Sequence, residues 1–236
     1  MIIPPATCTI TQTCFCETVK AGLIAQTSNT WSSLSFIIVG LIIGWLAMKD
    51  TKKFTLGKNL LKNNKTFGLF YGGLVIFIGL GTMYYHARLN LLGQFFDITG
   101  MYLLILSILF YRLPKIFNIQ KLKLFTGYIG ANFITILIQF LYPDTRRYIF
   151  AGLIILTLLV EYKIRKITSI TLQNSLLFLA IGTMLLGFII WILDITKILC
   201  NPHSLLQGHA IWHICCSLSA LFIYLYYRSE KTYLIT

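Results

Sequence analysis

The chain has 236 residues, of which 57% are hydrophobic and only 11% are charged. Soluble domains carry about 25% charged residues, so this composition excludes an ordinary soluble domain and predicts an integral membrane protein. The formal net charge of +13 does not indicate nucleic-acid binding, because Lys and Arg of membrane proteins gather in cytoplasmic loops. The chain has no internal repeat and no long linker, so residues 1–236 are expected to form one domain.

The first segment, residues 1–28, is expected to lie outside the cytoplasm. It lacks the basic start and the continuous apolar stretch of a cleavable signal peptide. It contains Cys8, Cys14 and Cys16, and Cys200 is expected on the same side, where disulfides can persist. A disulfide to Cys200 would hold this segment over the outer end of the protein. Spacing does not decide which cysteine pairs, and free thiols are the alternative.

Seven apolar segments follow, and together they predict an all-α bundle of seven transmembrane helices. A helix needs about 20 residues, with a range of about 17–25, to cross a bilayer. The fifth segment is short, but the basic side chains that flank it could reach both membrane surfaces. The segments are roughly Trp31–Met48, Gly68–His86, Phe95–Tyr111, Leu122–Tyr142, Tyr148–Tyr162, Ser175–Asp194 and Gly208–Tyr227.

The Lys and Arg residues between these segments predict the orientation of the bundle. Fifteen of the 20 lie after the first, third and fifth segments and in the C-terminal tail. The other five lie on the opposite side. Because positively charged loops face the cytoplasm, the N-terminus is predicted to lie outside or in a lumen, and the C-terminus in the cytoplasm.

This orientation places four polar residues in one outer layer of the membrane. His86 ends the second segment, and Asp97 lies in the first turn of the third. His209 and His213 lie in the first turns of the seventh. The placement requires that the fifth segment crosses the membrane, since otherwise the last segment would run in the opposite direction.

The three histidines of this layer predict a zinc site. His209 and His213 are four residues apart and share one helix face, and His86 supplies a third imidazole. Catalytic zinc takes three protein ligands and one water, whose pKa falls toward about 7. Asp97 would then bind the water or carry its proton. Thr82, four residues before His86, could hydrogen-bond the water or the oxyanion of a tetrahedral intermediate.

Each of these residues also has a purely structural interpretation. A single histidine at the membrane surface is more often a hydrogen-bonded packing residue, and a helix threonine such as Thr82 can bond its own backbone. Asp194, at the end of the sixth segment, is interpreted as structural. An aromatic stripe near the end of the seventh segment is interpreted as a membrane-interface belt, and it consists of Tyr224, Tyr226 and Tyr227.

Longer motifs around these residues add a family resemblance that covers most of the chain. In order, they are Cys16-Glu17, Ile24-Ala25-Gln26, Asn29-Thr30, Gly79-Leu80-Gly81-Thr82 with His86 and Asp97, Leu186-Gly187-Phe188 with Trp191 and Asp194, and Gln207-Gly208-His209-Ala210-Ile211-Trp212-His213. With this combined spacing the chain resembles the alkaline ceramidase family. That family lies within a superfamily of seven-span membrane hydrolases that includes adiponectin receptors and Per1-like proteins.

The resemblance implies an amide hydrolase. By it, His86, His209 and His213 hold zinc and Asp97 handles the proton. Water would attack the amide of a ceramide and release a sphingoid base and a fatty acid. The family usually has serine where this chain has Thr82, which keeps the hydroxyl and adds a methyl group.

The resemblance also bears on the N-terminal segment. The family pairs an N-terminal cysteine with one before the last span, which implies a disulfide between Cys16 and Cys200. Eukaryotic members resembling this chain bind calcium in this segment. Glu17 remains here as a calcium ligand, but Gln26 stands where the family usually has glutamate, and Val19 adds no acidic group. Calcium prefers six to eight oxygens, so tight calcium binding is not expected.

These observations predict a zinc-dependent membrane lipid amide hydrolase whose substrate is ceramide or a related acyl amide. The alternative is a non-enzymatic receptor or sensor with a structural zinc site, which would need neither Asp97 nor Thr82. A proton-coupled transporter is disfavoured, because the ionisable residues singled out lie at the outer edge. Short loops and the absence of a targeting tail favour a bacterial inner membrane, or an endoplasmic reticulum or Golgi membrane in a eukaryote. The sequence specifies no oligomeric state.

Overall fold

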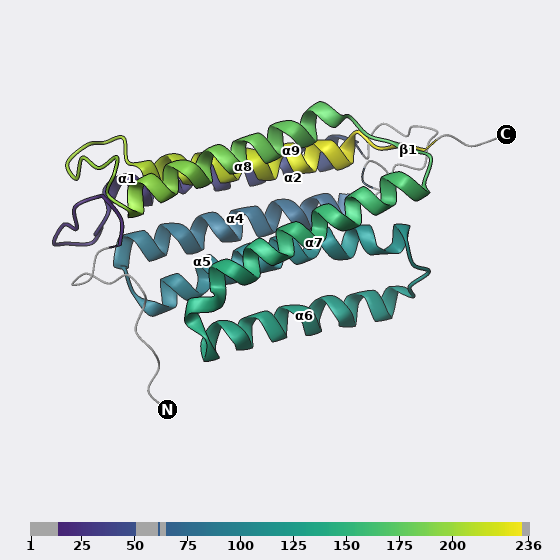
Figure 1. The fold of residues 1–236 in the computed structure, drawn as a ribbon, viewed down its shortest axis with the longest axis horizontal. Coiled ribbons are helices and arrows are strands. Elements are labelled where there is room, and N and C mark those ends of the chain that lie inside the picture. The colour runs from purple at the N-terminus through teal and green to yellow at the C-terminus, as the bar shows by residue number, and fades with distance from the viewer. Residues whose placement is uncertain (1–13, 51–60, 62–64, 233–236) are drawn as a thin grey trace.

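The computed structural model describes residues 14–50, 61 and 65–232. Figure 1 shows long helices lying side by side along one axis. The helices are α1 (Thr27–Ser32), α2 (Leu34–Asp50), α4 (Lys65–Arg88), α5 (Leu91–Arg112), α6 (Lys121–Leu141), α7 (Arg146–Ile167), α8 (Asn174–Ile195) and α9 (Gly208–Arg228). Two short 3-10 turns are η1 (Leu113–Lys115) and η2 (Pro143–Thr145), and the antiparallel strands are β1 (Ile170–Thr171) and β2 (Lys231–Thr232).

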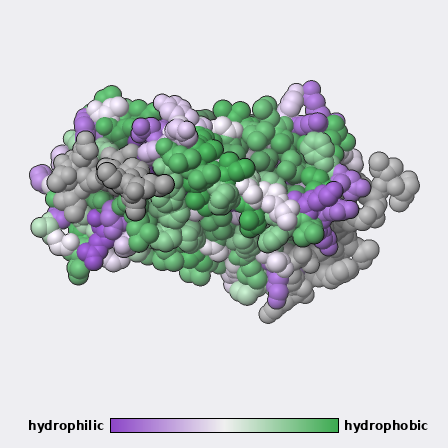
Figure 2. All heavy atoms as spheres, turned by 90° about the horizontal axis from the view of Figure 1, so that it is seen from below, coloured by the Kyte–Doolittle hydropathy of each residue, from purple (hydrophilic) through white to green (hydrophobic). Residues whose placement is uncertain are grey.

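The protein is an integral membrane protein, because six stretches of helix are long and apolar enough to cross a bilayer. At about 1.5 Å per residue, a helix of 21 residues spans the hydrocarbon layer of about 30 Å. The outward faces are apolar, and Leu41 of α2 and Phe178 of α8 are 59% and 71% exposed. Figure 2 shows that the middle of the face in view is mostly apolar, with polar residues gathered toward the two ends. The six stretches are Thr27–Asp50, Lys65–Arg88, Leu91–Lys115, Lys121–Leu141, Asn174–Ile195 and Gly208–Arg228.

Helix α7 corresponds to the fifth predicted segment, Tyr148–Tyr162, but it is longer than that segment. It has 22 residues, which is about 33 Å, and it lies beside the other long helices in Figure 1. Its six charged residues, more than in any of the six apolar stretches, separate its composition from theirs. They include Arg146 and Arg147 in the first turn, and Glu161 and Lys163 toward the other end. The crossing of the membrane by α7 stays a prediction.

The helices pack in an order that follows the chain only in part. Neighbours in sequence contact each other in the pairs α2–α4, α4–α5, α5–α6 and α8–α9. The last helix, α9, also returns to α2, and α7 packs on α5. A buried cluster joins α2, α4 and α9 through Ile43, Val75 and Tyr224. These long-range contacts bring the second and last predicted spans to the same part of the bundle.

The tyrosines near the end of α9 are buried, so their interpretation as a membrane-interface belt was wrong. Tyr224, Tyr226 and Tyr227 are 1%, 0% and 3% exposed. Tyr226 donates its hydroxyl hydrogen to Glu161, and the ring of Tyr227 lies 4.8 Å from the guanidinium carbon of Arg112. A tyrosine has one apolar and one polar end, which suits either a membrane interface or a buried site with polar partners. Here Tyr226 and Tyr227 have polar partners on α7 and α5, so they belong to a buried site.

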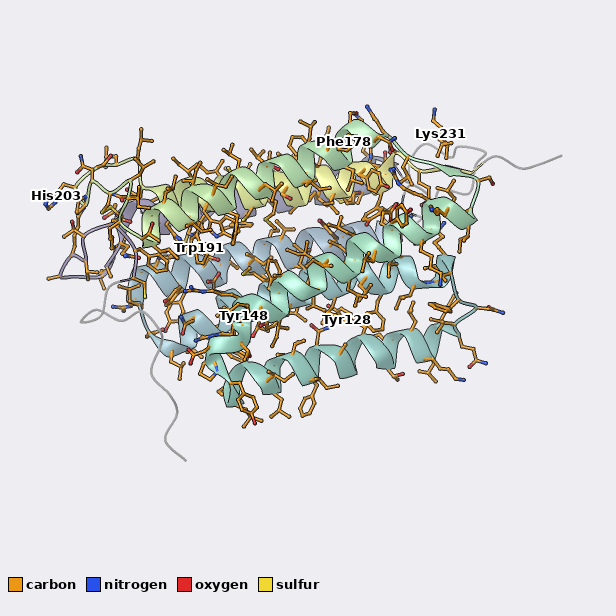
Figure 3. All side chains as sticks on the ribbon, in the orientation of Figure 1. Tyr128, Tyr148, Phe178, Trp191, His203 and Lys231 are labelled. Carbon is orange, nitrogen blue, oxygen red and sulfur yellow. A yellow bond between two sulfur atoms is a disulfide. The ribbon has the colours of Figure 1, made fainter. Side chains whose placement is uncertain are left out.

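The two ends of the bundle are marked in Figure 3 by His203 and Lys231. We call them the His203 end and the Lys231 end. The turns after α5 and after α7 lie at the Lys231 end, whereas the turn between α4 and α5 and the loop before α9 lie at the His203 end. Several residues of the predicted basic loop after the first span are outside the described residues, namely Lys52, Lys53, Lys58 and Lys62.

Candidate metal centre and its cavity

Three buried histidines meet at the His203 end. His86 lies near the end of α4, and His209 and His213 occupy the first two turns of α9. One ring nitrogen of each lies within 4.8 Å of the others, and the Nε2 atoms of His86 and His209 are 3.1 Å apart. The three residues are 0%, 6% and 3% exposed. Over the described part of the chain, this is the group of His, Cys, Asp and Glu side chains that could share a metal ion.

Hydrogen bonds determine which nitrogen is free in two of the histidines. His86 Nδ1 lies 2.8 Å from the amide oxygen of Gln26, so it donates its hydrogen there and leaves Nε2 free. His213 Nδ1 lies 2.8 Å from Ser32 Oγ. Since the Ser32 hydroxyl donates to the carbonyl oxygen of Asn29 at 3.0 Å, it accepts from His213, whose Nε2 is also free. Partners of this kind orient histidines that bind metals.

The donor set fits a transition metal ion. Neutral imidazole nitrogens suit zinc, copper, iron and nickel. Zinc–nitrogen bonds of about 2.0–2.1 Å at tetrahedral angles place two ligand nitrogens about 3.4 Å apart. The observed separation of 3.1 Å between Nε2 of His86 and Nε2 of His209 is close to that value. His209 Nδ1 is buried and has no hydrogen-bond partner within the described residues.

Asp194 of α8 positions His209 through the backbone. Its Oδ2 accepts a hydrogen bond from the His209 N–H at 3.1 Å, and its Oδ1 accepts one from the Cys16 N–H at 3.0 Å. A Cβ at Gly208 would lie 2.9 Å from Asp194 Cβ, so glycine lets the start of α9 approach α8. The buried carboxylate also interacts favourably with the N-terminus of α9. It thereby joins α8, α9 and the N-terminal segment.

The N-terminal segment covers the histidines from the His203 end. Cys16 and Cys200 form a disulfide, as the family resemblance implied. Beside it, the ring of Phe15 lies 4.0 Å from that of His209 and 5.0 Å from that of His86, measured between ring centres. Phe15 is 8% exposed. The disulfide therefore holds an apolar side chain directly on two of the three imidazoles.

Glu17 binds the backbone at the start of α1. Its Oε1 accepts from the Ser28 N–H at 2.6 Å, and its Oε2 accepts from the Asn29 N–H at 2.9 Å. These N–H groups belong to the first turn of a helix and have no partner within the helix. The carboxylate that the sequence offered as a calcium ligand thus has donors on both oxygens.

Thr82 and Asp97 form a second polar pair between α4 and α5. The Thr82 hydroxyl donates its hydrogen to Asp97 Oδ1. The helices approach closely here, because a Cβ at Gly81 would lie 2.9 Å from the backbone nitrogen of Asp97. A tight turn with Leu89 in the left-handed region, at φ 47°, joins the two helices. A hydroxyl has only one hydrogen, so Thr82 cannot donate to an oxyanion while it holds Asp97.

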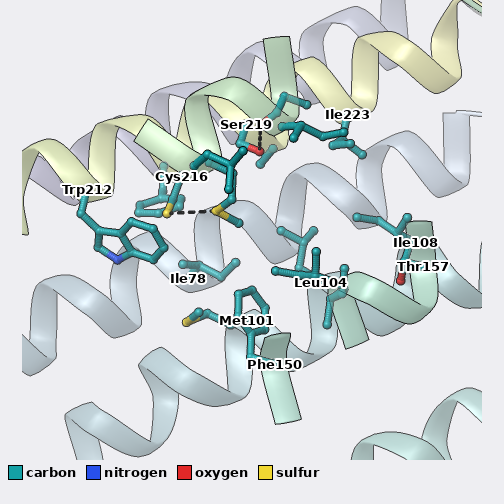
Figure 4. A pocket seen from close by; sticks show the side chains of 18 of the residues that line it. Ile78, Met101, Leu104, Ile108, Phe150, Thr157, Trp212, Cys216, Ser219 and Ile223 are labelled. Carbon is teal, nitrogen blue, oxygen red and sulfur yellow. Dashed lines mark hydrogen bonds between the residues drawn. The ribbon is translucent and has the colours of Figure 1, made fainter. Parts of the chain in front are cut away.

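An apolar cavity begins at these residues and extends toward the Lys231 end. Its empty volume is about 1370 Å³ with its open side included. Figure 4 shows Trp212 near one end of the cavity and Ile108, Thr157 and Ile223 near the other. The polar part of its wall at the His203 end consists of Thr82, Asp97, His209 and His213.

Comparison with known proteins assigns the chain to a family. The family model described as Ceramidase matches residues 9–233. The chain belongs to the ceramidase family. It is 26% identical to Alkaline ceramidase 1 of Mus musculus over 208 residues, which are 84% of this chain and 71% of the mouse protein. The resemblance read from the motifs is confirmed.

In this ceramidase family member, the predicted site residues gather in two groups at one end of one cavity. His86, His209 and His213 form the possible metal centre, and Thr82 pairs with Asp97. The aspartate is outside the close histidine group, but it lines the same cavity. Their roles in catalysis stay predictions.

Sequence reasoning missed the residues that support this ceramidase site. Gln26 and Ser32 contact histidines that are 60 and 181 positions away in the chain. Phe15 was not singled out, because its contacts with two imidazoles depend on how the N-terminal segment folds over α4 and α9. Asp194 was interpreted as structural, and its two backbone contacts give that role a specific location next to His209. A Gln or Ser near a helix start carries no signal that names such a distant partner.

Proposed function

We propose that this protein is a zinc-dependent ceramide amidohydrolase, which cleaves the N-acyl bond of ceramide to give a sphingoid base and a fatty acid. Membership of the ceramidase family supports a ceramide substrate and a hydrolase that acts on an amide. The observation that carries the proposal is the position of three buried histidines at one end of an apolar cavity, beside Thr82 and Asp97. An amide at that end could place its lipid chain in the cavity.

The chain's own residues would divide the work as follows. His86, His209 and His213 would hold zinc through neutral imidazole nitrogens. Zinc bound there would supply a Lewis acid and lower the pKa of water to about 7. Asp97 would accept the proton of the attacking water and deliver it to the leaving nitrogen, as a general base and then acid. Thr82 would hold Oδ1 of Asp97, which leaves Oδ2 for the proton.

The same arrangement supports an enzyme that does not need calcium. Glu17, the remaining acidic residue of the N-terminal calcium motif, has both oxygens bonded to the backbone of α1. Within the described residues, the histidine cluster is the group of three or more His, Cys, Asp or Glu side chains that could hold a metal ion. We therefore assign the metal requirement to zinc alone.

We further propose that the protein crosses the membrane seven times, with the histidines on the non-cytoplasmic side. The excess of basic residues in alternate loops supports this orientation. The disulfide between Cys16 and Cys200 also supports it, because disulfides persist outside the cytoplasm. The short loops favour a bacterial inner membrane over an endoplasmic reticulum or Golgi membrane.

His213→Ala is the variant that tests the proposed function. Loss of one of three imidazoles should remove zinc and lower ceramide hydrolysis by about 100-fold or more. Fatty acid release and zinc content are measured on the purified protein in lipid. His203→Ala, at an exposed loop histidine, is the control and should keep both values.

Two other measurements separate the proposal from its alternatives. A zinc-selective chelator should abolish hydrolysis and added zinc should restore it, whereas a calcium-selective chelator should have no effect. A receptor with a structural zinc site would lose zinc in His213→Ala without any hydrolysis by the wild type. A His213→Ala protein with wild-type activity and unchanged zinc content would overturn the proposal.

A further inference from the structure

A buried cluster of charged side chains lies at the Lys231 end of the cavity. Arg112 of α5 pairs with Glu161 of α7, with Nε 2.9 Å from Oε2, and with Glu230 after α9, with Nη1 2.7 Å from Oε2. Lys115 of η1 lies 2.6 Å from the other carboxylate oxygen of Glu230. Arg112 is 0% exposed, and both glutamates are buried. We call these four residues the charge cluster.

The charge cluster forms part of the floor of the cavity. Glu161 and Tyr227 both line the cavity, and the Tyr227 ring lies 4.8 Å from the guanidinium carbon of Arg112. Tyr226 adds a hydrogen bond to Glu161. Moving these groups apart would leave buried charges without partners, which is strongly unfavourable. The position of the floor is therefore fixed by ion pairs between three parts of the chain.

The helices that line the cavity give its depth above this floor. Along α5, Asp97 and Ile108 are eleven residues apart, and along α9, His213 and Tyr227 are fourteen residues apart. At 1.5 Å per residue, these separations are about 16 and 21 Å. An extended alkyl chain advances about 1.3 Å per carbon–carbon bond. About 13–16 such bonds therefore fit between the polar residues of the site and the floor, if the cavity is as deep as these helix separations.

The acyl chain is the part of a ceramide that matches this cavity. Its methylene groups begin directly at the amide carbonyl, and the cavity wall becomes apolar one turn below Asp97, with Met101, Phe150 and Met184. The sphingoid base carries hydroxyl groups close to the amide nitrogen. Burying those hydroxyls against an apolar wall without hydrogen-bond partners is unfavourable, so the sphingoid base stays outside this part of the cavity.

We propose that the floor formed by Glu161 and Tyr227, which the charge cluster holds in place, sets the longest acyl chain that the enzyme accepts, at about 14–17 carbons. The inference rests on the proposed ceramide hydrolysis and names the group that the cavity selects. An acyl chain shorter than this limit moves from the apolar bilayer into an equally apolar cavity, so its length has little effect on the rate of hydrolysis. A longer chain meets Glu161 and Tyr227 before its amide reaches the histidines, and such a misplacement of the reacting group lowers the rate strongly.

The limit is tested with ceramides that share one sphingoid base and differ only in acyl length. The full-length protein hydrolyses them in bilayers of one composition, and kcat/KM is measured for each. Substrates with eight, twelve and sixteen acyl carbons should differ by no more than about fivefold, whereas kcat/KM for twenty-four carbons should be about tenfold or more lower than for sixteen. Equal values for sixteen and twenty-four carbons would overturn the inference.

Ala220→Leu should move the limit to shorter chains. Ala220 lines the cavity, seven residues after His213 and therefore about 10 Å deeper. The added side chain should lower kcat/KM for sixteen carbons about tenfold and leave the eight-carbon substrate unchanged. Ala151→Leu, on the exposed face of α7, is the matched control and should not alter the dependence on length.

Tyr227→Ala should act in the opposite direction, because it removes a ring from the floor. The expected result is a higher kcat/KM for twenty-four carbons relative to sixteen. If this variant does not fold, Ala220→Leu still decides, and an unchanged length dependence in that variant would contradict the inference. Absence of hydrolysis at every acyl length in the wild type would instead contradict the proposed function.

Discussion

At the scale of single residues, Thr82 offers the sharpest test of how the polar pair works. Thr82→Val keeps the branched shape but removes the hydroxyl that binds Asp97. We expect kcat to fall about 10–100-fold, as for other groups that orient a functional side chain, with KM little changed. Thr82→Ser keeps the hydroxyl and should stay near wild-type activity. If the hydroxyl served only its own helix, Thr82→Val would be as active as Thr82→Ser.

The same scale shows what single residues could and could not reveal in the sequence. His209 and His213 were found because four residues is one helical turn, and the structure places both rings at one site. Gln26 and Ser32 hold two of the three histidines, but such contacts depend on how α1 packs against α4 and α9. Periodicity describes one helix at a time, so it cannot supply that packing.

At the scale of helices, the close approach of α4 and α5 at Gly81 controls the position of Asp97. A Cβ at Gly81 would lie 2.9 Å from backbone atoms of Phe96 and Asp97, so Gly81→Ala must push the helices apart. We expect about a tenfold or greater loss of kcat while zinc content stays normal, because no metal ligand is removed. Gly73→Ala on the same helix, where a Cβ meets nothing within 4 Å, is the control. Equal activity of the two variants would show that this approach does not position Asp97.

The length of the apolar segments predicted the helices well, but the sequence did not predict which polar and aromatic side chains are buried together. The predicted span Gly68–His86 lies within α4, and Gly208–Tyr227 nearly coincides with α9. The interpretation of the tyrosine stripe as a membrane-interface belt was wrong, because an aromatic pattern does not distinguish residues at a lipid interface from residues packed around a buried ion pair. Glu161, inside the fifth predicted segment, was the available signal of that ion pair. Its partner Arg112 follows a different predicted span, so the sequence alone could not predict that the two residues form an ion pair.

At the scale of the whole molecule, two independent features support one orientation. Basic residues favour the cytoplasm for the loops at the Lys231 end. A disulfide ties the N-terminal segment to the loop before α9 through Cys16 and Cys200, and disulfides favour the other side. Both features favour the non-cytoplasmic side for the three histidines. Because the disulfide puts the N-terminal segment and the loop before α9 on one side, the helices between them must cross the membrane an even number of times. The helices α2, α4, α5, α6 and α8 supply five crossings, and α7 would supply the sixth.

Thiol labelling of intact cells can test whether α7 crosses the membrane. Asp144→Cys lies before α7 and Gln173→Cys after it, both at exposed positions. An impermeant maleimide should label Asp144→Cys from outside, and Gln173→Cys only after the membrane is opened. Among the described residues, Cys14, Cys16 and Cys200 are disulfide-bonded, and the free thiols Cys215 and Cys216 lie within α9. The unsubstituted protein is labelled in parallel to measure the native background. Labelling of both positions from the same side would show that α7 does not cross the membrane. The histidines of α9 would then lie on the opposite side of the membrane from His86, which contradicts the distance of 4.8 Å between the ring centres of His86 and His209.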